Sequence, residues 1–393
     1  MAKIMSNKLN VIQVYQTDPS LNDQGGGIRY VCNLTTNLLK RNIGITFLGV
    51  GKKNYSDREL NFIKVDSSVR GYLSFGIKLF KYSLNRTLLL GKVVHVHRLY
   101  YGLPFSLFSW FTGCKVICTL HGRTFEVFKD KNSTIASKLV FPLFYFIEYL
   151  SLRLVDEVIP VSQDVIDSFI EKYPSLESKI AVIDNIIPSM LNLSDFNELP
   201  SKEDSLRELG LSTDFRYLCF IGRFAKVKDI PFIINLVNEN KCYFSKNSIK
   251  VILCGHGEDF EEVKLSINQL GLNVFFHLTG VVESAEIKHV YNSSELTLIC
   301  SKHEAGPTVL IESIAANTPV VSNDVGEVKE VLSAGRVGVL TDKTTESYFY
   351  AIKTVLEQDN FFDLNTGIKI TNSRGSESIT DKYIEKYMGL FKK

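Results

Sequence analysis

Long apolar runs are missing from this chain of 393 residues, although hydrophobic residues make up 45% of it. No run approaches the ~20 apolar residues that a membrane-spanning helix needs. Residues 1–10 lack the apolar centre of a secretory signal peptide. These absences argue against a membrane-spanning or exported protein, and we expect a cytoplasmic one. The formal net charge of +2 likewise gives no overall excess of either sign.

Cysteine is scarce, and its spacing does not indicate a disulfide framework. The chain has seven cysteines, an odd number, and no Cys-x-x-Cys pair occurs. Most lie in apolar runs, so we expect reduced thiols in the core and neither a disulfide scaffold nor a zinc site.

The length fits two domains of roughly 150 to 200 residues each. Apolar strand signals alternate with helical stretches such as residues 135–154, which predicts parallel βαβ units with ligands beyond the carboxyl ends of the strands. Residues 184–204 carry turn-forming residues and little periodicity, so we place a domain linker there. The expected strands cover residues 10–15, 45–50, 62–65, 93–97, 116–120, 157–161, 217–221, 251–254, 275–279 and 296–300.

The most informative stretch is residues 303–312, between a predicted strand and a predicted helix. Pro307 suits the first helical position, so Gly306 becomes the expected N-cap. The backbone amides of Thr308 and Val309 would then be free and would form, with the helix dipole, an anion site.

Two carboxylates flank this turn. Glu304 is expected in the loop above the anion site, and Glu312 lies five residues into the helix, about 7.5 Å further along. The end with Glu304 suits a sugar and the end with Glu312 suits a ribose, with the phosphates between them. Two spaced glutamates at a solvated helix start are the simpler interpretation when this motif is taken alone.

The surrounding residues favour the functional interpretation. Glu304 and Glu312, followed by residues 317–321, Gly326 and Glu330, resemble the nucleotide-sugar site of the retaining GT-B glycosyltransferases of the "glycosyl transferases group 1" family. Two positions depart from the family pattern, because Ala305 and Glu327 stand where the family usually has glycine.

The resemblance implies an α/β protein of the GT-B class, with two Rossmann-like parallel-sheet domains facing a cleft. Residues 1–190 would form the acceptor-side domain and residues 191–375 the donor-binding domain. The last helix, expected at residues 381–391, would return to the first domain, so that residues 376–393 belong to it and the second crossing lies within residues 372–378.

Basic residues follow the first strand of the second domain. Arg223 and Lys228 match the family's diphosphate-binding arginine and lysine. A guanidinium supplies a bidentate fork and an ammonium a mobile point charge. The alternative is a solvated basic helix start, but two positive charges there oppose the helix dipole and need an anion or a carboxylate nearby.

Other matches are less specific. Gly26 and Gly27, in a glycine-rich turn between strand and helix, match a family glycine pair that faces the donor from the first domain. His121, at a predicted strand end, matches the histidine near the reacting sugar, whereas His97 is the weaker candidate. Gly280 with Val281 corresponds to the family position beside the base.

Residues 67–125 contain no Asp or Glu but eight basic residues and eleven aromatic ones. A basic, aromatic surface suits an anionic membrane. A nucleic-acid groove is the competing interpretation, but no nucleic-acid motif accompanies it. The basic residues are Arg70, Lys78, Lys81, Arg86, Lys92, Arg98, Lys115 and Arg123.

The resemblance implies a retaining, hexosyltransferase-type enzyme that moves a sugar from a nucleotide diphosphate sugar to a hydroxyl acceptor. The resemblance implies His121, Arg223, Lys228 and Glu304 as catalytic and no cofactor beyond the donor, and we expect a UDP-sugar in preference to a GDP-sugar. Because no Asp-x-Asp occurs, we expect no metal-bridged diphosphate.

We expect the acceptor to be a lipid-linked glycan of bacterial surface polysaccharide, such as O-antigen, lipopolysaccharide or capsule, with the enzyme peripheral on the inner face of the cytoplasmic membrane. Two alternatives remain open: a nucleotide-sugar 2-epimerase on the same fold, and a non-catalytic two-lobed sugar-binding protein.

Overall fold

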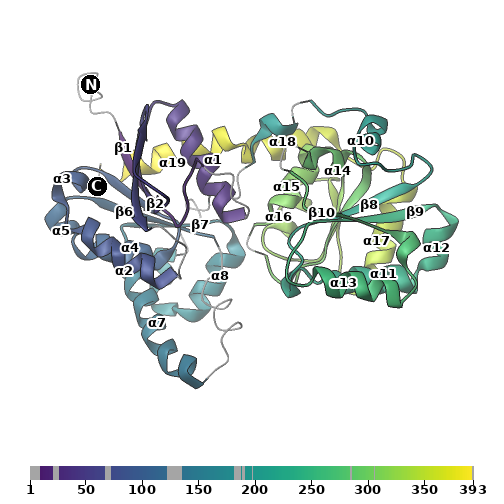
Figure 1. The fold of residues 1–393 in the computed structure, drawn as a ribbon, viewed down its shortest axis with the longest axis horizontal. Helices are drawn as coiled ribbons and strands as arrows, with labels where there is room; N and C mark the ends of the chain where they lie inside the picture. The colour runs from purple at the N-terminus through teal and green to yellow at the C-terminus, as the bar shows by residue number, and fades with distance from the viewer. Residues whose placement is uncertain are drawn as a thin grey trace. The chain divides into compact units, whose positions relative to one another are not determined.

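The structure is a computed structural model in which residues 9–20, 26–66, 72–121, 135–180, 187, 191–196, 198–283, 286–304 and 306–391 are described. The chain forms two compact units, one of residues 1–190 with 376–393 and one of residues 191–375. Each unit has one mainly parallel sheet with helices on both faces (Figure 1). The predicted α/β class with two Rossmann-like sheets is therefore confirmed.

The first unit contains a seven-stranded sheet in the order β3-β4-β2-β1-β5-β6-β7. All neighbours are parallel except β3 and β4. Without β3, an edge strand of three residues that the sequence did not predict, the order is that of a doubly wound nucleotide-binding fold. The strands are β1 (Asn10–Val14), β2 (Gly44–Val50), β3 (Tyr55–Asp57), β4 (Leu60–Asp66), β5 (Val93–Val96), β6 (Lys115–Leu120) and β7 (Glu157–Pro160).

Helices cover both faces of this sheet, because a parallel strand such as β5 is buried on both sides. One face packs against α1 and α19, and α4 approaches the other so closely that a Cβ on Gly102 would lie 3.2 Å from Val96. The helices are α1 (Gly26–Lys40), α2 (Tyr72–Ser83), α3 (Arg86–Leu89), α4 (Leu99–Leu107), α5 (Ser109–Thr112), α7 (Ile135–Leu154), α8 (Gln163–Lys172), α9 (Glu177–Ile180) and α19 (Ser376–Gly389).

The C-terminal helix α19 belongs to the first unit and packs against α1 (Figure 1). It begins five residues before the expected start, because its first turn buries polar side chains that give no apolar signal. Thr380 Oγ1, for example, donates to the carbonyl of Ser376 at 2.6 Å. Further along, Tyr387 OH contacts His95 Nδ1 at 2.7 Å, and Tyr383 OH contacts Thr119 Oγ1 at 2.8 Å.

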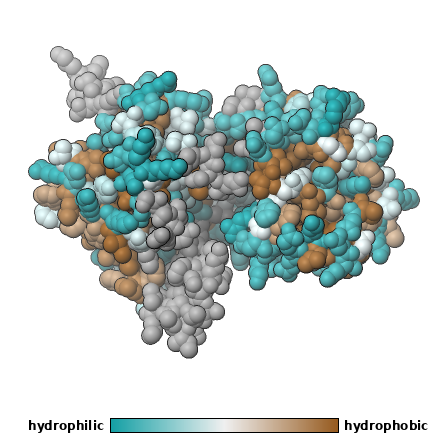
Figure 2. Space-filling model, in the orientation of Figure 1, coloured by the Kyte–Doolittle hydropathy of each residue, from teal (hydrophilic) through white to brown (hydrophobic). Residues whose placement is uncertain are grey.

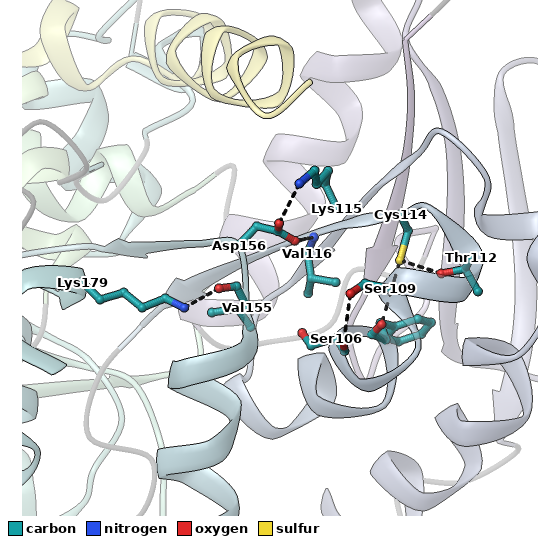
Figure 3. A network of polar contacts seen from close by, with 10 residues as sticks. Ser106, Ser109, Thr112, Cys114, Lys115, Val116, Val155, Asp156 and Lys179 are labelled. Carbon is teal, nitrogen blue, oxygen red and sulfur yellow. Dashed lines mark hydrogen bonds and ion pairs between the residues drawn. The ribbon is translucent and has the colours of Figure 1, made fainter. Parts of the chain in front are cut away.

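The amino edge of the same sheet is held by charged side chains that bind backbone groups (Figure 3). Asp156, just after α7, accepts from the amide of Val116 at 2.8 Å and from Lys115 Nζ at 3.0 Å. Lys179 Nζ donates to the carbonyls of Arg153 and Val155 at 2.7 and 2.5 Å. Because the last carbonyls of a helix have no partner within it, Lys179 caps α7.

The second unit contains a six-stranded, fully parallel sheet in the order β10-β9-β8-β11-β12-β13. Along the chain, β9 and β10 are added on one side of β8, and β11, β12 and β13 on the other. The carboxyl ends of β8 and β11 therefore form the topological switch point. The strands are β8 (Arg216–Ile221), β9 (Ile249–Cys254), β10 (Phe276–Gly280), β11 (Ser294–Ile299), β12 (Val320–Ser322) and β13 (Gly338–Leu340).

Two apolar cores flank this sheet, because residues alternate along each strand. In β8, Leu218 and Phe220 face one core and Tyr217 and Cys219 the other. On the first face lie α11 (Ile230–Glu239), α12 (Lys241–Lys246), α13 (Phe260–Gln269) and α17 (Thr345–Glu357). On the second lie α10 (Lys202–Glu208), α14 (Ile287–Asn292), α15 (Thr308–Ala315), α16 (Val328–Leu332) and α18 (Leu364–Arg374).

The chain enters and leaves the second unit side by side. The amide of Leu191 donates to the carbonyl of Arg374 at 3.0 Å, within a parallel bridge between Leu191 and Gly375. The stretch expected to be the linker, residues 184–204, contains this entry point, although α10 already begins at Lys202.

The remaining expectations about composition can be compared with the structure. All seven cysteines are free thiols, as expected, but Cys242 is exposed and is no core residue. None of the helices described combines the length and the apolarity needed to cross a bilayer.

The buried contact between His95 and Tyr387 gives a first prediction. Tyr387→Phe leaves a buried ring nitrogen without its partner, so the free energy of unfolding should fall by ~1–3 kcal/mol. Urea denaturation followed by circular dichroism measures this change. Met388→Ala, at an exposed position on the same helix, is the control and should stay within about 0.5 kcal/mol of wild type. Equal effects of the two substitutions would contradict a stabilising role for the hydroxyl.

Candidate active site

An ion pair crosses the switch point of the second unit. Lys228 follows β8 and Glu304 follows β11, and Lys228 Nζ contacts Glu304 Oε1. Ser301 Oγ donates to the same oxygen at 2.6 Å. The side chains of Lys228 and Glu304 are only 22% and 14% exposed, so the pair is shielded from bulk solvent. The structure thus joins two residues that are 76 positions apart in the sequence.

Glycines allow the loops after β8 and β9 to touch. At Gly255, where φ is +134°, an added Cβ would lie 1.9 Å from the carbonyl oxygen of Gly222. At Gly257 it would lie 2.3 Å from the carbonyl oxygen of Phe224. Any side chain at these positions would push the turn that carries Arg223 and Lys228 away from the strand ends.

Arg223 is exposed and donates to Glu258 Oε1 at 2.8 Å. An exposed pair of this kind is worth ~0–1 kcal/mol. Arg223 can therefore exchange Glu258 for another anion at little cost. Both basic residues of the turn have the carboxylate that we expected them to need, but the sequence did not predict Glu258 as a partner.

The end of β10 lies next to the end of β9, where the carbonyl of Gly280 accepts from the amide of Gly255 at 2.8 Å. Gly280 has φ +68°, a left-handed conformation that favours glycine. The following residue, Val281, is exposed. Both expected base-side positions thus lie at the carboxyl edge of the sheet.

The start of α15 differs from the expectation by one residue. The helix begins at Thr308, and Pro307 with an extended ψ of 109° is the N-cap, so the prediction of Gly306 was wrong. The carbonyl of Pro307 accepts the first helical bond, from Leu310 N at 3.0 Å. The amides of Thr308 and Val309 have no partner within the helix in either arrangement, so the expected anion-binding amides remain.

Glu312 is buried in α15 and accepts from the hydroxyl of Tyr291 at 2.7 Å. Burial, followed by the charge of Glu312, raises the pKa of Tyr291 well above its usual value. Tyr291 therefore remains a hydrogen-bond donor that fixes the Glu312 carboxylate. Sequence reasoning missed Tyr291, which lies in α14, 21 positions before Glu312 in the chain.

The departure from the family pattern at Glu327 has a structural explanation. Glu327 is buried and pairs with Arg374 at the end of α18, while Glu330 lies 3.4 Å from the same guanidinium. Burial raises the pKa of Glu327 to about 7, and Arg374 opposes this shift. A glycine at this position could not tie the loop after β12 to α18.

The remaining predicted residues lie in the first unit, at the carboxyl edge of its own sheet. The sequence placed Gly26 and Gly27 in a turn before a helix, whereas in the structure they form the first turn of α1. A Cβ on Gly27 would lie 3.0 Å from the hydroxyl of Tyr15, at the end of β1. Glycine therefore permits a close approach of α1 to this strand end.

His121 follows β6 and is held on two sides. Its Nε2 lies 3.1 Å from Nδ1 of His97, and its ring packs edge-to-face with Tyr30 at 4.7 Å between centroids. Burial, and then the charge of Arg98, lowers the pKa of His121 to about 3. The imidazole is therefore neutral at physiological pH and suits hydrogen bonding more than proton transfer.

The predicted residues thus form two groups, one in each unit. One group, at the carboxyl edge of the second sheet, comprises Arg223, Lys228, Gly280, Val281, Glu304, Pro307, Thr308, Val309 and Glu312. Gly26, Gly27 and His121 form the other. Within the described parts of both units, no group of three or more His, Cys, Asp or Glu side chains could hold a metal ion.

Comparison with known families divides the chain as the two units do. Residues 24–189 match the family described as "Glycosyltransferase Family 4", and residues 201–366 match "Glycosyl transferases group 1". Together the two matches cover most of the chain.

Several curated proteins are similar in sequence. An uncharacterized glycosyltransferase of Methanocaldococcus jannaschii is 26% identical over 61% of this chain and 58% of its own length. The alpha-maltose-1-phosphate synthase of Mycolicibacterium smegmatis is 25% identical over 65% of this chain and 66% of its own. The O-antigen chain mannosyltransferase RfbU of Salmonella typhimurium is 26% identical over 65% and 69%. The chain thus spans less than two thirds of the first two relatives.

Solved structures match over nearly the full length. Sucrose-phosphate synthase from Thermosynechococcus elongatus has a TM-score of 0.78 at 15% identity and covers 98% of this chain and 99% of its own. WaaG, a glycosyltransferase involved in lipopolysaccharide biosynthesis, has a TM-score of 0.71 at 13% identity, with 97% and 100% covered. Anabaena HepE in complex with UDP and glucose has a TM-score of 0.72 at 15% identity, with 96% and 99% covered.

The two family matches, the paired Rossmann-like sheets and these full-length likenesses lead to one assignment. The chain belongs to the glycosyltransferases that combine a family 4 first half with a group 1 second half, and it has the GT-B fold.

Proposed function

We propose that the protein transfers a hexose from a nucleotide diphosphate sugar to a hydroxyl acceptor with retention of anomeric configuration. The observation that carries this proposal is the shielded pair of Lys228 and Glu304 at the switch point, close in sequence to the free amides that begin α15. A cation, helix amides and a carboxylate are the groups that a diphosphate and a sugar hydroxyl require.

Each group has a separate task in this reaction. Lys228, Arg223 and the amides of Thr308 and Val309 stabilise the diphosphate as the bond from the anomeric carbon to its oxygen breaks. Glu304 and His121 hold sugar hydroxyls, and Glu312 binds the ribose. The acceptor oxygen attacks on the face that the diphosphate leaves, and a phosphate oxygen takes the acceptor proton.

A UDP-sugar is the favoured donor, which is supported by HepE, a fold relative whose structure contains UDP and glucose. Lys228 and Arg223 supply positive charge that a divalent metal would otherwise provide, and no Asp-x-Asp occurs in the chain. The proposal therefore includes transfer without a metal ion. Persistence of activity in EDTA supports this part, and a specific requirement for Mn²⁺ would contradict it.

The acceptor in this proposal is a lipid-linked glycan of a bacterial surface polysaccharide, reached at the cytoplasmic face of the membrane. RfbU is described as an O-antigen chain mannosyltransferase and WaaG as a glycosyltransferase involved in lipopolysaccharide biosynthesis. Both likenesses support that class of acceptor. The exterior of the first unit supports a membrane partner more directly.

Large apolar side chains are exposed on α2, α4 and α5 of this unit and directly after α2 and α3. Among these helices, α2 and α5 each contact both α3 and α4. Trp110 is 83% exposed, and Figure 2 shows apolar side chains gathered where Figure 1 labels α5, α4 and α2. The exposed residues are Ile77, Phe80, Leu84, Leu90, Leu107, Trp110 and Phe111. We name them the apolar face.

Charge accompanies the apolar face in a more limited way than the sequence predicted. Lys78 pairs with Asp66 at 2.5 Å and Lys115 with Asp156 at 3.0 Å, so neither offers a free charge. Lys81 and Arg86 are exposed, and the Arg86 guanidinium lies 5.9 Å from the ring centroid of Phe111. Arg70 and Arg123 lie outside the described residues. Apolar burial therefore contributes at least as much as charge to the proposed membrane contact.

The first test concerns the diphosphate. Lys228→Met should lower kcat/KM at least tenfold, because a charged contact to a phosphate is worth ~1.5–3 kcal/mol. Steady-state transfer assays over a panel of UDP- and GDP-sugars measure this change. Lys226→Met, at an exposed position two residues earlier on the same turn, is the matched control and should keep wild-type turnover. Equal turnover of the Lys228 and Lys226 variants would contradict the assignment of Lys228 to the diphosphate. An epimerised donor as the product would favour the epimerase.

Substitutions of the two glutamates should have different effects on nucleotide binding, which calorimetry measures. Glu312→Gln keeps an acceptor for Tyr291 but removes the charge at the ribose, so free UDP should bind about tenfold more weakly. Glu304→Gln should leave UDP affinity within about twofold and reduce transfer. If both substitutions weaken UDP binding equally, the two carboxylates do not serve opposite ends of the donor.

Membrane binding can be tested by flotation with vesicles that contain anionic lipid. Trp110→Ala should reduce binding about tenfold, since burial of a large apolar side chain contributes ~1.5–3 kcal/mol. Lys81→Glu with Arg86→Glu should also weaken binding, as should high salt. Tyr350→Ala, exposed in α17 of the second unit, is the control and should bind as wild type does. A wild-type protein that fails to bind at low ionic strength would contradict a membrane partner.

A further inference from the structure

Three histidine rings lie together at the carboxyl edge of the first sheet. His95 and His97 come from β5 and its end, with ring centroids 4.1 Å apart, and His121 follows β6 with its ring 5.3 Å from that of His97. His95 and His97 are fully buried, whereas His121 keeps partial exposure. Only His121 among them can therefore reach a substrate.

The hydrogen bonds of the cluster are nearly all accounted for. His95 uses both ring nitrogens, with Tyr387 OH on Nδ1 and Thr119 Oγ1 on Nε2. Nδ1 of His97 contacts Nε2 of His121 at 3.1 Å. In the part of the chain that the structure describes, the buried Nε2 of His97 has no hydrogen-bond partner.

Neutral rings leave two possible proton arrangements. Burial lowers the pKa of both His97 and His121, so each ring carries a single proton near neutral pH. In one arrangement His121 donates from Nε2, and the proton of His97 sits on its own Nε2. In the other, His97 donates from Nδ1, and the proton of His121 sits on Nδ1.

The environment of His97 distinguishes the two. The first arrangement buries an N–H of His97 with no acceptor, whereas the second leaves only a bare nitrogen there. Buried N–H groups without acceptors are the rarer and more costly case. The second arrangement is therefore the more stable.

From this we infer that His97 is a positioning residue: it donates from Nδ1 to Nε2 of His121 and thereby makes Nδ1 of His121 a hydrogen-bond donor toward an oxygen of the donor sugar. The inference rests on the proposed role of His121 in holding the sugar.

Neighbouring side chains keep the pair in this orientation. Tyr30 packs edge-to-face on His121, and its hydroxyl contacts that of Tyr383 in α19 at 2.8 Å. Tyr383 in turn contacts Thr119, which binds His95. Rotation of the His121 ring would thus disturb a packed, hydrogen-bonded layer. The ring therefore keeps one orientation, and its Nδ1 acts as a hydrogen-bond donor.

A donor at this position predicts a particular substrate preference. A sugar hydroxyl that accepts from His121 can be replaced by fluorine, which still accepts weakly, but not by hydrogen, which cannot accept. If His121 were an acceptor, fluorine and hydrogen would be equally poor replacements.

Nitrogen-15 NMR of the histidine-labelled wild-type protein tests the proton positions without substrate or activity. The shifts of a neutral imidazole distinguish its bare nitrogen from its protonated one. His97→Asn and His121→Gln assign the signals of the two rings. We expect protons on Nδ1 of both His97 and His121. A proton on Nε2 of His121, or a charged ring, would overturn the inference whatever the enzyme does.

Substrate analogues test the consequence. The probe is whichever UDP- or GDP-hexose raises the melting temperature of the wild-type protein, with each sugar hydroxyl away from the anomeric carbon replaced in turn by fluorine or hydrogen. At one position the fluoro donor should bind about fivefold more tightly than the deoxy donor.

Variants of His97 complete the test. His97→Phe keeps a ring but cannot donate, so the difference between fluoro and deoxy donors should disappear, while His97→Asn, which retains a donor near the Nδ1 position, should restore it. A difference that persists in a folded His97→Phe protein would contradict the positioning role. Absence of any transfer by the wild type would instead contradict the proposed function and leave the NMR result intact.

Discussion

Parallel strands place all their carboxyl ends at one edge of a sheet, and every residue proposed for sugar transfer depends on that constraint. In the second unit, β8 and β11 are neighbours although 72 residues, 222–293, lie between them in the chain. The loops after them therefore meet, and Lys228 reaches Glu304. Gly255 and Gly257, which follow β9, let the loop after β9 touch the loop after β8 that carries Lys228.

Apart from the edge strand β3, the two units have the same strand order, but different chemistry stabilises the carboxyl edges of their sheets. In the second, charged groups pair at the edge, and the most buried pair, Glu327 with Arg374, ties a loop to α18. In the first, neutral histidines and tyrosine hydroxyls form a buried polar layer beneath His121. Charged side chains that can exchange partners suit a diphosphate, whereas neutral ones suit sugar hydroxyls, which carry no charge to balance.

The helical exterior of the first unit shows how a charge count can mislead. Residues 67–125 contain eight basic and no acidic residues, yet two of the lysines there pair with Asp66 and Asp156. Asp66 lies directly before this stretch and Asp156 well after it, so a count over the stretch alone misses the neutralisation. What folding leaves exposed is apolar as well as basic, with Trp110 as its most exposed large side chain.

The sequence by itself determined the local features of this protein. Apolar runs bounded by glycine and proline located most strands, and the spacing of Glu304, Pro307 and Glu312 indicated a strand-to-helix anion site. Such signals are readable because each depends on neighbours within a few residues. The same locality explains the errors, since Pro307 and Gly306 are both plausible caps until the first helical bond is seen.

Only the tertiary structure decided which distant groups act together. Three contacts join residues from different strands or helices, and no periodicity in the sequence indicates them. They are Tyr291 with Glu312, Glu258 with Arg223, and His97 with His121. Tertiary burial also made His121 neutral and gave Glu327 its partner. Partners and pKa values depend on the packing around a group, and that packing is set by the order of the strands in the sheet rather than by their order in the chain.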